Sequence, residues 1–481
     1  MTRHRPTSGL GGGQIPPHPP GFRLRRGRNW FFLGLTYASY YLCRYNLGII
    51  APELKRDLGL SNAQYGSIQS ARDGAYAVGQ FVNGLFTDRL GGKQAMTFGA
   101  IGTVILNILF GLTAWSNLGW LFFTLFVIRL ADGYVQAFGA PGMVKINAAW
   151  FRRRERGAFA GIFGGMIQLG AIGVGQLGRL LATGFAVPLI FFTITVPKLD
   201  WRYMFFVPPA IVVIIIILMN LMVRNHPEEA GYRIVHEDET HDEDPHARLS
   251  LGEVFRTITS NRIVWIVACA YFCTGFVRRS IESWWVLYLD EVWGAGKASA
   301  EFIILVWVLP ATAFLGSYGS GVISDKLVAG RRAPVAALIY LSESLFTTLA
   351  LLLSLSGRLD SIVVALLLLV GINVTCNSTH SILGAAAPMD LGGRKMAGFA
   401  LGIIDSFQYL GAMLAGFGLG RLLDYAAQTR AQGMAAAGGA QPAAQFDATA
   451  WFGSMLPFGM LGAVLMMYLW FRYRGTGERG T

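Results

Sequence analysis

Charged residues are scarce in this sequence. Only 14% of its 481 residues are Asp, Glu, Lys or Arg, whereas 53% are hydrophobic; soluble globular proteins carry about a quarter charged residues. This composition argues against a water-soluble enzyme. It favours a multi-pass protein of a cell inner membrane, because about 20 apolar residues are enough for one membrane-spanning helix.

Cysteine is scarce as well. The four cysteines lie inside apolar segments, and none has the paired spacing of a zinc site or of a disulfide framework. We therefore expect no metal site and no cofactor. A net charge of +12 could indicate nucleic-acid binding, but most Lys and Arg residues flank apolar runs, so we interpret this charge as a signal of membrane topology and expect no nucleic-acid partner.

The apolar runs predict an all-α membrane protein with twelve transmembrane helices in two sets of six. The first set covers residues 30–52, 65–87, 95–114, 120–145, 157–180 and 203–223, and the second covers 263–289, 300–323, 334–354, 361–385, 397–421 and 451–472. The predicted parts are a disordered cytoplasmic tail (1–28), an N-terminal bundle (29–224), an acidic cytoplasmic linker (225–262), a C-terminal bundle (263–472) and a second cytoplasmic tail (473–481).

The distribution of basic residues predicts the orientation of the chain. Lys and Arg are concentrated before the first span, after every second span and at the end of the last one. The positive-inside bias therefore places both termini and the linker in the cytoplasm. A shorter apolar run at 183–199, interrupted by Pro188 and Pro197, predicts a re-entrant or interfacial hairpin on the outer side.

A short motif occurs once in each half of the sequence. Gly84, Asp88 and Arg89 follow the second span, and Gly321, Asp325 and Lys326 follow the eighth, with the two aspartates 237 residues apart. An aspartate followed by a base can pair across a short turn, and glycine permits close helix approach. The motif resembles one of the major facilitator superfamily. This resemblance implies two pseudo-symmetric six-helix bundles that rock about a central site, with the motif residues taking part in gating.

Two arginines are predicted at equivalent depths in the two halves. Arg44 and Arg278 each lie about 15 residues into a span and are 234 residues apart. A charge near the bilayer centre is costly and requires a partner or a function. Guanidinium groups match the oxygens of phosphate or carboxylate groups, so the pair predicts an anionic substrate. The alternative is a buried salt bridge to Glu282 or Asp405 without substrate contact.

Further polar residues share helix faces with these arginines. We expect them to line a central cavity or to couple transport to a proton. The cavity residues are Tyr37, Tyr41, Tyr76, Gln80, Asp405 and Tyr409, and the coupling or supporting residues are Glu282, Asp73, Lys145 and His380. Simpler interpretations remain open: His380 as a hydrogen-bonded bundle residue, and Asp73 as the partner of Arg72.

The segments around both arginines resemble those of the organophosphate:phosphate antiporters. The similar segments include residues 40–46 and 284–289. The family contains glycerol-3-phosphate and hexose-6-phosphate transporters and a sugar-phosphate sensor. The resemblance implies that Arg44 and Arg278 hold the phosphate and that Tyr37, Tyr41, Tyr76 and Tyr409 line the cavity. This chain departs from the family at Gln80, where the transporters carry a lysine; Lys145 would restore that positive charge.

We therefore predict a secondary transporter, acting as a monomer in the lipid bilayer, that exchanges an organic phosphate for inorganic phosphate by alternating access. Two alternatives remain. One is a proton-coupled anion symporter in which Asp405, Glu282 or Asp73 carries the proton. The other is a membrane sensor of sugar phosphate. The spans contain no arrangement of nucleophile, base and oxyanion donors, so we do not expect an enzyme.

Overall fold

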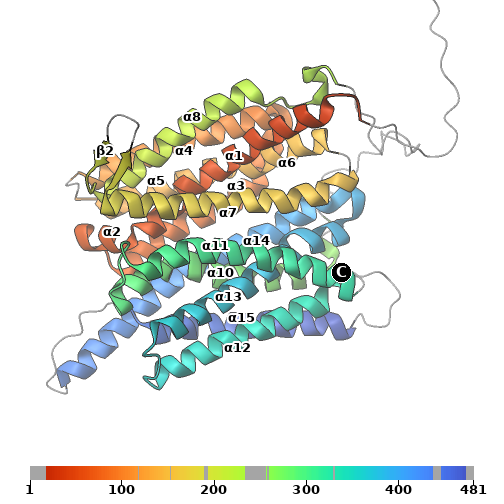
Figure 1. The fold of residues 1–481 in the computed structure, drawn as a ribbon. Coiled ribbons are helices and arrows are strands. Elements are labelled where there is room, and N and C mark those ends of the chain that lie inside the picture. The colour runs from red at the N-terminus through yellow and green to blue at the C-terminus, as the bar shows by residue number, and fades with distance from the viewer. Residues whose placement is uncertain are drawn as a thin grey trace, which may run out of the picture.

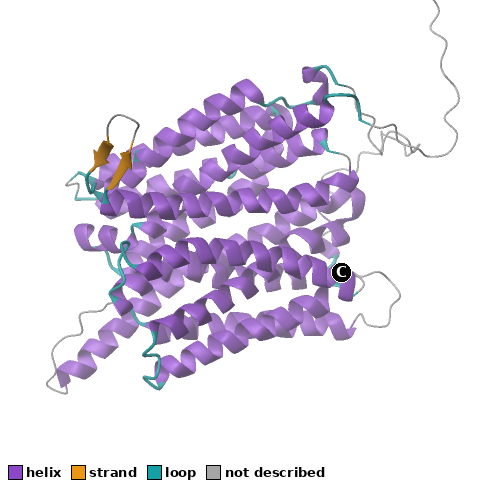
Figure 2. Cartoon of the chain, viewed as in Figure 1, coloured by secondary structure: helices purple, strands orange, loops and turns teal. Residues whose placement is uncertain are grey.

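The computed structural model describes residues 18–116, 119–151, 153–188, 193–232, 256, 259–328, 331–436 and 446–472. Residues 1–17 and 473–481 and most of the predicted linker lie outside this set, as do the side chains of Asp88 and Asp325. The described residues are almost entirely helical, apart from one two-stranded sheet (Figure 2).

In the described part of the chain twelve long helices, with α5 and α6 counted as one, lie roughly side by side (Figure 1). The first half contains α1 (Phe22–Ile49), α3 (Asn62–Leu90), α4 (Gly92–Ala114), the paired α5 (Leu121–Gln136) and α6 (Gly139–Trp150), α7 (Arg153–Thr183) and α8 (Val207–Met222). The second half contains α10 (Arg262–Trp293), α11 (Ala300–Leu327), α12 (Arg332–Leu355), α13 (Ile362–Ser381), α14 (Ala387–Ala436) and α15 (Ala448–Arg472). The predicted all-α fold of two six-helix bundles is confirmed.

Four shorter helical pieces connect or extend these rods. They are α2 (Ala51–Leu58), the 3-10 helices η1 (Trp201–Phe205) and η2 (Pro227–Ala230), and the π-helical segment η4 (Ile382–Ala386). Because η4 leads directly from α13 into α14, no loop separates these two helices. The predicted boundaries of the two bundles and the linker stay a prediction.

Eight of the described helices are long and apolar enough to cross a membrane, judged by length and composition. The four long helices that fall outside this group are α1, α3, α7 and α14. A helix buried inside a bundle can carry a polar face that a lipid-exposed helix cannot. Three of these four helices supply residues of the site described below, and α7 lines the adjoining cavity.

The first helix begins earlier than the sequence pattern indicates. α1 starts at Phe22, whose buried ring stacks on Trp150 with ring centroids 5.8 Å apart. Arg25 Nη2 donates to the carbonyl oxygen of Met222 at 3.0 Å. The prediction of a disordered tail is therefore wrong for residues 22–28, because these side chains pack on α6 and α8.

The apolar run at 183–199 forms a β-hairpin. Strands β1 (Phe185–Pro188) and β2 (Thr193–Val196) pair antiparallel, with Phe185 opposite Val196. The hairpin and α2 lie at the end of the bundle opposite the C-terminus (Figure 1). We call this end the hairpin end, and the end that carries Phe22 and Arg472 the terminal end. Entry of the hairpin into the bilayer stays a prediction.

Local sequence signals determine where α3 begins and ends. At its start, Ser61 Oγ accepts from the Gln64 backbone N–H at 3.2 Å, and Gln64 Oε1 accepts from the Ser61 N–H at 3.0 Å. This reciprocal capping box satisfies two backbone donors that the first turn leaves unpaired. At the other end Gly91 has a φ of 84°, which favours glycine and allows the chain to turn at once into α4.

The two halves approach most closely where α3 crosses α14. A Cβ atom built on Gly66 would lie 2.0 Å from the carbonyl oxygen of Gly416, so neither glycine leaves room for a side chain. Ser70 Oγ donates to the carbonyl oxygen of Met413 at 2.6 Å. The Asp424 carboxylate accepts from two backbone N–H groups at the start of α3, at 2.9 and 3.0 Å, where the helix dipole favours negative charge.

Ion pairs and aromatic packing close the hairpin end. Lys55 Nζ lies 2.8 Å from Glu291 Oε1, and Lys297 pairs with Glu53, each pair joining the two halves. Burial lowers the pKa of the Lys297 ammonium, and the Glu53 carboxylate opposes that shift. Tyr65 packs edge-on against Trp284 and donates to the Ser283 carbonyl oxygen at 2.7 Å. Tyr65 and Trp284 belong to a single buried apolar cluster that contains side chains of both halves.

The α3–α14 crossing provides a stability test. We expect Gly66→Ala to lower the free energy of unfolding by about 1–3 kcal/mol, because the new methyl group collides with the Gly416 backbone. Thermal unfolding in detergent measures this change. Gly402→Ala on α14 is the control, since no atom lies within 4 Å of its added Cβ; it should be neutral or slightly stabilising. Equal stability of the two variants would contradict the close crossing.

Candidate substrate-binding site

Arg44 is held in a fixed orientation five residues before the end of α1. Its side chain is buried, with 4% of its surface exposed. Nε donates to Gln136 Oε1 at 2.9 Å, and the guanidinium carbon lies 4.7 Å from the ring centroid of Tyr41 and 4.6 Å from that of Tyr76. Among the described residues, Arg44 Nη2 has no hydrogen-bond partner. This donor is thus available to an anion.

Arg278 reaches the same region from α10 in the other half. Its Nη2 lies 3.0 Å from Glu282 Oε1, and its Nη1 lies 3.5 Å from His380 Nε2. Glu282 Oε1 also accepts from the Tyr45 hydroxyl at 3.1 Å, which links α10 to α1. The salt bridge to Glu282 considered as an alternative is therefore present. The Nε atom of Arg278 still has no hydrogen-bond partner among the described residues.

The backbone of Arg44 is itself a binding point for two further arginines. Its carbonyl oxygen accepts from Arg72 Nη1 at 2.8 Å and from Arg129 Nη2 at 3.3 Å. Arg129 Nη1 in turn lies 3.0 Å from Asp132 Oδ2, and Gln136 Nε2 donates to both Asp132 oxygens at 3.0 Å. Asp132 therefore positions Gln136, which positions the side chain of Arg44.

A buried carboxylate connects the two halves. Asp73 has no exposed surface and pairs with its neighbour Arg72. From the other half, Arg279 Nη2 donates to Asp73 Oδ1 at 3.0 Å, and Arg279 Nε lies 2.9 Å from Asp73 Oδ2. Arg279 Nη1 lies 3.1 Å from Glu282 Oε2. The described contacts thus link Arg44 to Arg278 through these residues rather than directly.

Together these residues form an arginine network with an excess of positive charge. It contains five arginines and three carboxylates, which leaves an excess of two cations when all are ionised. The members are Arg44, Arg72, Arg129, Arg278 and Arg279 with Asp73, Asp132 and Glu282. Uncompensated charge in a membrane interior is costly. The network is therefore suited to a ligand that carries negative charge.

Tyrosines surround the two available arginine donors. The ring centroids of Tyr76 on α3 and Tyr409 on α14 lie 4.4 Å apart, so the two rings pack against each other. Tyr41 packs against Tyr37 at 5.7 Å and against Tyr45 at 5.3 Å. The Tyr76 hydroxyl is buried and has no hydrogen-bond partner among the described residues. The predicted tyrosine-lined region is therefore assembled from both halves.

Three further predicted polar residues lie close to this region: Gln80, Asp405 and His380. Gln80 is half-buried one turn after Tyr76 on α3, and Asp405 is half-buried one turn before Tyr409 on α14. Neither arginine forms an ion pair with Asp405 among the described contacts. His380 Nδ1 shares a hydrogen bond with the Tyr271 hydroxyl, 2.6 Å away. Its other ring nitrogen, Nε2, lies 3.5 Å from Arg278 Nη1.

Lys145 lies far from the arginine network. Its Nζ donates to the Thr87 carbonyl oxygen at 3.1 Å, and Thr87 follows Arg72 by 15 residues on α3, which corresponds to about 22 Å along the helix. With Arg89 it lines a hollow of about 520 Å³ at the terminal end. The expectation that Lys145 restores charge at the substrate site is therefore wrong.

The repeated loop motif is placed only in part. Arg89 and Lys326 are exposed at the ends of α3 and α11, while the side chains of both motif aspartates lie outside the described set. Among the described residues, a Cβ atom on Gly84 or Gly321 would meet no atom within 4 Å. These two glycines therefore do not mark close helix crossings here, in contrast to the expectation; the gating role of the motif stays a prediction.

Sequence reasoning missed Arg279 of the network and Gln136, which orients Arg44. Arg279 was overlooked because its neighbour Arg278 accounted for the charge at that depth, although successive helical residues point in directions about 100° apart. Gln136 was overlooked because an amide in a helix has no distinctive pattern. The i, i+4 spacing from Asp132 to Gln136 is the signal that could have indicated it.

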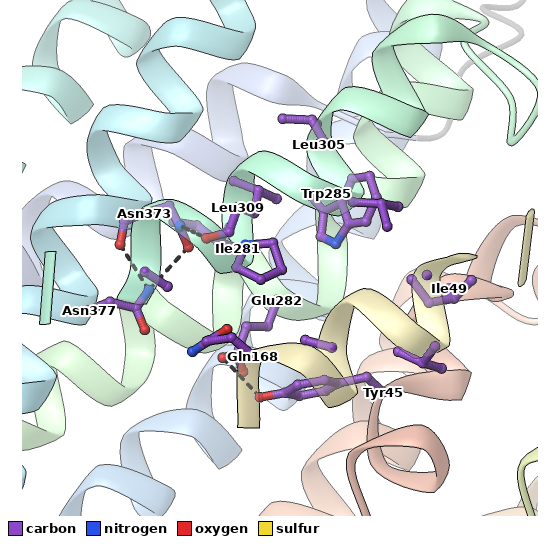
Figure 3. Close-up of a pocket in the computed structure, with 16 residues that line it drawn as sticks. Tyr45, Ile49, Gln168, Ile281, Glu282, Trp285, Leu305, Leu309, Asn373 and Asn377 are labelled. Carbon is purple, nitrogen blue, oxygen red and sulfur yellow. Dashed lines mark hydrogen bonds between the residues drawn. The ribbon is translucent and has the colours of Figure 1, made fainter. Parts of the chain in front are cut away.

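A cavity adjoins the network on the side of Glu282 (Figure 3). Its volume is about 630 Å³, including space open to the surroundings. The lining side chains come from α1, α7, α10, α11 and α13, and therefore from both halves. Within the described residues no group of three His, Cys, Asp or Glu side chains could hold a metal ion.

Residues 33–416 match the family described as the Major Facilitator Superfamily. The chain belongs to the major facilitator superfamily. This family consists of membrane transporters, which confirms the predictions of a multi-pass membrane protein and of a protein that is not an enzyme.

Curated relatives of this superfamily member cover most of its length. A probable hexose phosphate transport protein of Chlamydia pneumoniae is 26% identical, covering 84% of this chain and 86% of that protein. A glycerol-3-phosphate transporter of Bacillus subtilis (strain 168) is 28% identical, covering 80% and 84%. The membrane sensor protein UhpC of Escherichia coli (strain K12) is 26% identical, covering 84% and 87%. The predicted resemblance to organophosphate transporters and their sensor is confirmed.

Solved structures of the superfamily agree on the fold. A bacterial homologue of the human lysosomal transporter Spinster, in an inward-facing and unoccupied conformation, matches with a TM-score of 0.72 at 16% identity. The match covers 95% of this chain and 98% of that one. At this identity the likeness concerns the fold alone.

The central position of Asp73 leads to a stability prediction. Asp73→Asn leaves Arg72 and Arg279 without their shared buried carboxylate, so we expect the free energy of unfolding to fall by about 3–5 kcal/mol. Thermal unfolding in detergent measures the change. The control is Asp200→Asn, which weakens the pair of Asp200 with Arg202, where the aspartate is 41% exposed; its cost should stay below about 1 kcal/mol. A similar small loss in both variants would show that Asp73 does not hold the halves together.

Proposed function

We propose that this protein is a secondary transporter that exchanges an organic phosphate for inorganic phosphate by alternating access. The observation that carries this proposal is the pair of incompletely bonded guanidinium groups, Arg44 and Arg278, within a network that has two excess positive charges. A phosphate dianion supplies two negative charges and several acceptor oxygens. It would neutralise the network and accept from both arginines.

The available donors suit a tetrahedral oxyanion. Arg44 Nη2, Arg278 Nε and the Tyr76 hydroxyl are buried polar atoms without partners among the described residues. Hydrogen bonds from an ionised donor to an ionised acceptor are about twice as strong as bonds between neutral groups. We therefore assign Arg44 and Arg278 the role of phosphate ligands, with Tyr37, Tyr41, Tyr76, Gln80 and Tyr409 around the substrate.

The same charge balance would account for obligatory exchange. Without an anion, the excess charge would have to be enclosed by low-dielectric surroundings whenever the halves close over the site, and such enclosure is costly. A bound phosphate removes this cost. A ligand shifts the equilibrium between two states only through its different affinity for each, and compensation of charge in the closed state supplies that difference.

The closed hairpin end fits one state of such a cycle. In the predicted orientation the terminal end, with both chain termini, faces the cytoplasm of the inner membrane. The ion pairs of Lys55 with Glu291 and of Lys297 with Glu53 would then block the outer side. Opening that side requires these pairs to separate, and we propose that the loop motif with Gly84, Asp88, Arg89, Gly321, Asp325 and Lys326 controls the opposite side.

The curated relatives support the substrate class. Their names include transporters for hexose phosphate, glycerol-3-phosphate and phosphoglycerate, and a phosphate group is the part that these substrates share. The relatives also include a membrane sensor. A sensor that binds sugar phosphate without transporting it therefore remains the alternative from another functional class.

One observation favours a second transport mechanism. Asp405 is half-buried one turn before Tyr409 on α14 and has no ion-pair partner among the described contacts. An acid in this position could bind and release a proton together with substrate, which would make the protein a proton-coupled anion symporter. Glu282 and Asp73 are less suited to that role, because each is engaged by arginines.

Exchange can be measured with purified protein in proteoliposomes. We expect uptake of radiolabelled phosphate to require phosphate inside the vesicles. Arg44→Lys and Arg278→Lys should each lower uptake by at least about tenfold, because an ammonium group cannot replace the planar fork of donors. The control is Arg421→Lys, since Arg421 lies exposed on α14 over the ring of Phe417 and should leave uptake unchanged.

Other outcomes of this experiment would point elsewhere. Uptake that is driven by a pH gradient without internal phosphate, and is lost in Asp405→Asn, would establish the symporter instead. Phosphate binding without any uptake would favour the sensor. Full uptake in both arginine variants would contradict the proposed site.

A further inference from the structure

The cavity beside Glu282 is built from both halves and is largely apolar. The apolar lining consists of Ile49, Ala171, Val174, Ile281, Leu305, Val306, Leu309, Pro310 and Ala313 together with the ring of Trp285. Its polar lining residues are Tyr45, Gln168, Glu282, Asn373 and Asn377. A mainly hydrophobic pocket with a few placed polar groups is the usual form of a small-molecule site.

Most of the polar groups in the lining are already occupied. Tyr45 donates to Glu282, which also binds Arg278 and Arg279. Asn373 Nδ2 donates to the Leu309 carbonyl oxygen at 2.8 Å, and its Oδ1 accepts from Asn377 Nδ2 at 3.1 Å. Figure 3 shows the bonds of Tyr45 with Glu282, of Asn373 with Leu309 and of Asn377 with Asn373 at the edge of the cavity.

Few polar groups of the lining remain without a hydrogen-bond partner. The Gln168 amide, the Asn377 side-chain oxygen and the Trp285 indole N–H form no hydrogen bond among the described contacts. A hexose has several hydroxyl groups, and each of them needs a partner when it leaves water. The three lining groups offer three N–H donors and two amide oxygens, which is fewer than the donor and acceptor positions of a hexose, because each hydroxyl both donates and accepts. An organic group with one or two polar atoms needs no more partners than this lining offers.

The position of the cavity connects it to the proposed phosphate site. Glu282 lines the cavity and is the ion-pair partner of Arg278. A ligand whose phosphate lies between Arg44 and Arg278 would therefore project its organic part past Glu282 and into the cavity. No arginine or lysine lines this space, so a second negative charge on the organic part would face the Glu282 carboxylate without compensation.

We infer that the organic part of the substrate is apolar: an alkyl or aryl phosphate with at most one or two hydrogen-bonding groups, rather than a polyhydroxylated sugar phosphate. This inference rests on the proposed function and narrows its substrate class. It departs from the hexose phosphate named for the relative from Chlamydia pneumoniae. Because α7 and α11 of opposite halves both line the cavity, the organic group would contact both moving parts.

The inference is tested by competition against phosphate exchange in proteoliposomes. The probes are phenyl phosphate and glucose 6-phosphate, and the measured quantity is the concentration of each that halves the uptake of labelled phosphate. Phenyl phosphate should inhibit at a concentration at least about tenfold lower than glucose 6-phosphate, because buried apolar contacts of this size discriminate by such factors. Equal inhibition, or stronger inhibition by glucose 6-phosphate, would overturn the inference.

Two variants locate the apolar contact. Ala313→Phe fills the cavity from α11, so the inhibition constant of phenyl phosphate, divided by the KM for inorganic phosphate, should rise about tenfold. Val306→Thr keeps the shape and adds a hydroxyl group that can donate to the carbonyl oxygen one turn earlier on α11, so the same ratio should rise by a smaller factor. Leu315→Phe is the control, because Leu315 is 63% exposed on the outside of α11; the ratio should stay unchanged.

The outcomes separate this inference from the function on which it rests. An unchanged ratio in both cavity variants would show that the organic group lies elsewhere, and the cavity would then hold another occupant, such as a lipid chain. Phosphate exchange would be unaffected by that result. If phosphate does not exchange at all, the proposed function fails and the inference fails with it.

Discussion

The site depends on one buried carboxylate, Asp73. It is shared by Arg72 of its own half and Arg279 of the other. Through Arg72 it supports the carbonyl oxygen of Arg44, and through Arg279 it supports Glu282, which holds Arg278. Asp73 thus supports both proposed phosphate ligands, Arg44 at its backbone and Arg278 through Glu282, while Gln136 and Asp132 orient the side chain of Arg44. Because the pairs cross between the halves, movement of the halves necessarily changes the site.

The balance of charge explains how such a network could be useful rather than merely stabilising. Each carboxylate of the network is already bonded to one or more arginines, so the excess of two cations cannot be removed internally. Water can solvate this excess while one end of the bundle is open, but it cannot do so once both ends close. The phosphate of the bound substrate would neutralise this excess in every conformation. In the proposed mechanism the adjoining apolar cavity would add selection for the organic group, because hydroxyl groups that enter it would lose their hydration.

The sequence was informative about position along a helix and much less about rotation around it. Equivalent depths in the two halves identified Arg44 and Arg278, and helical spacing identified Tyr37, Tyr41, Tyr76 and Tyr409, because both inferences need only a count of residues. Lys145 was misplaced because its distance from the membrane centre depends on how α6 packs on α3. Arg279 was missed because the direction of its side chain depends on where α10 faces α3.

Contacts between distant segments also limited the predicted boundaries. The early start of α1 at Phe22 results from packing on Trp150 and on α8, which no local pattern in residues 22–28 indicates. Gly66 and Gly416 fit a close crossing, whereas the more conspicuous Gly84 and Gly321 of the repeated motif do not. The twelve-helix fold, by contrast, follows from composition and from apolar runs that are long enough to span a bilayer.

We propose above all that phosphate, by neutralising the arginine network, allows the terminal end to close. This proposal can be tested by pulsed electron paramagnetic resonance with one spin label at Leu90 of α3 and one at Lys326 of α11, both exposed near that end. Cys269, the exposed cysteine among the four, is first replaced by serine. The account predicts that saturating phosphate shortens the distance between the labels, that chloride does not, and that the change is lost in Arg44→Lys. An unchanged distance while phosphate is demonstrably bound would contradict it.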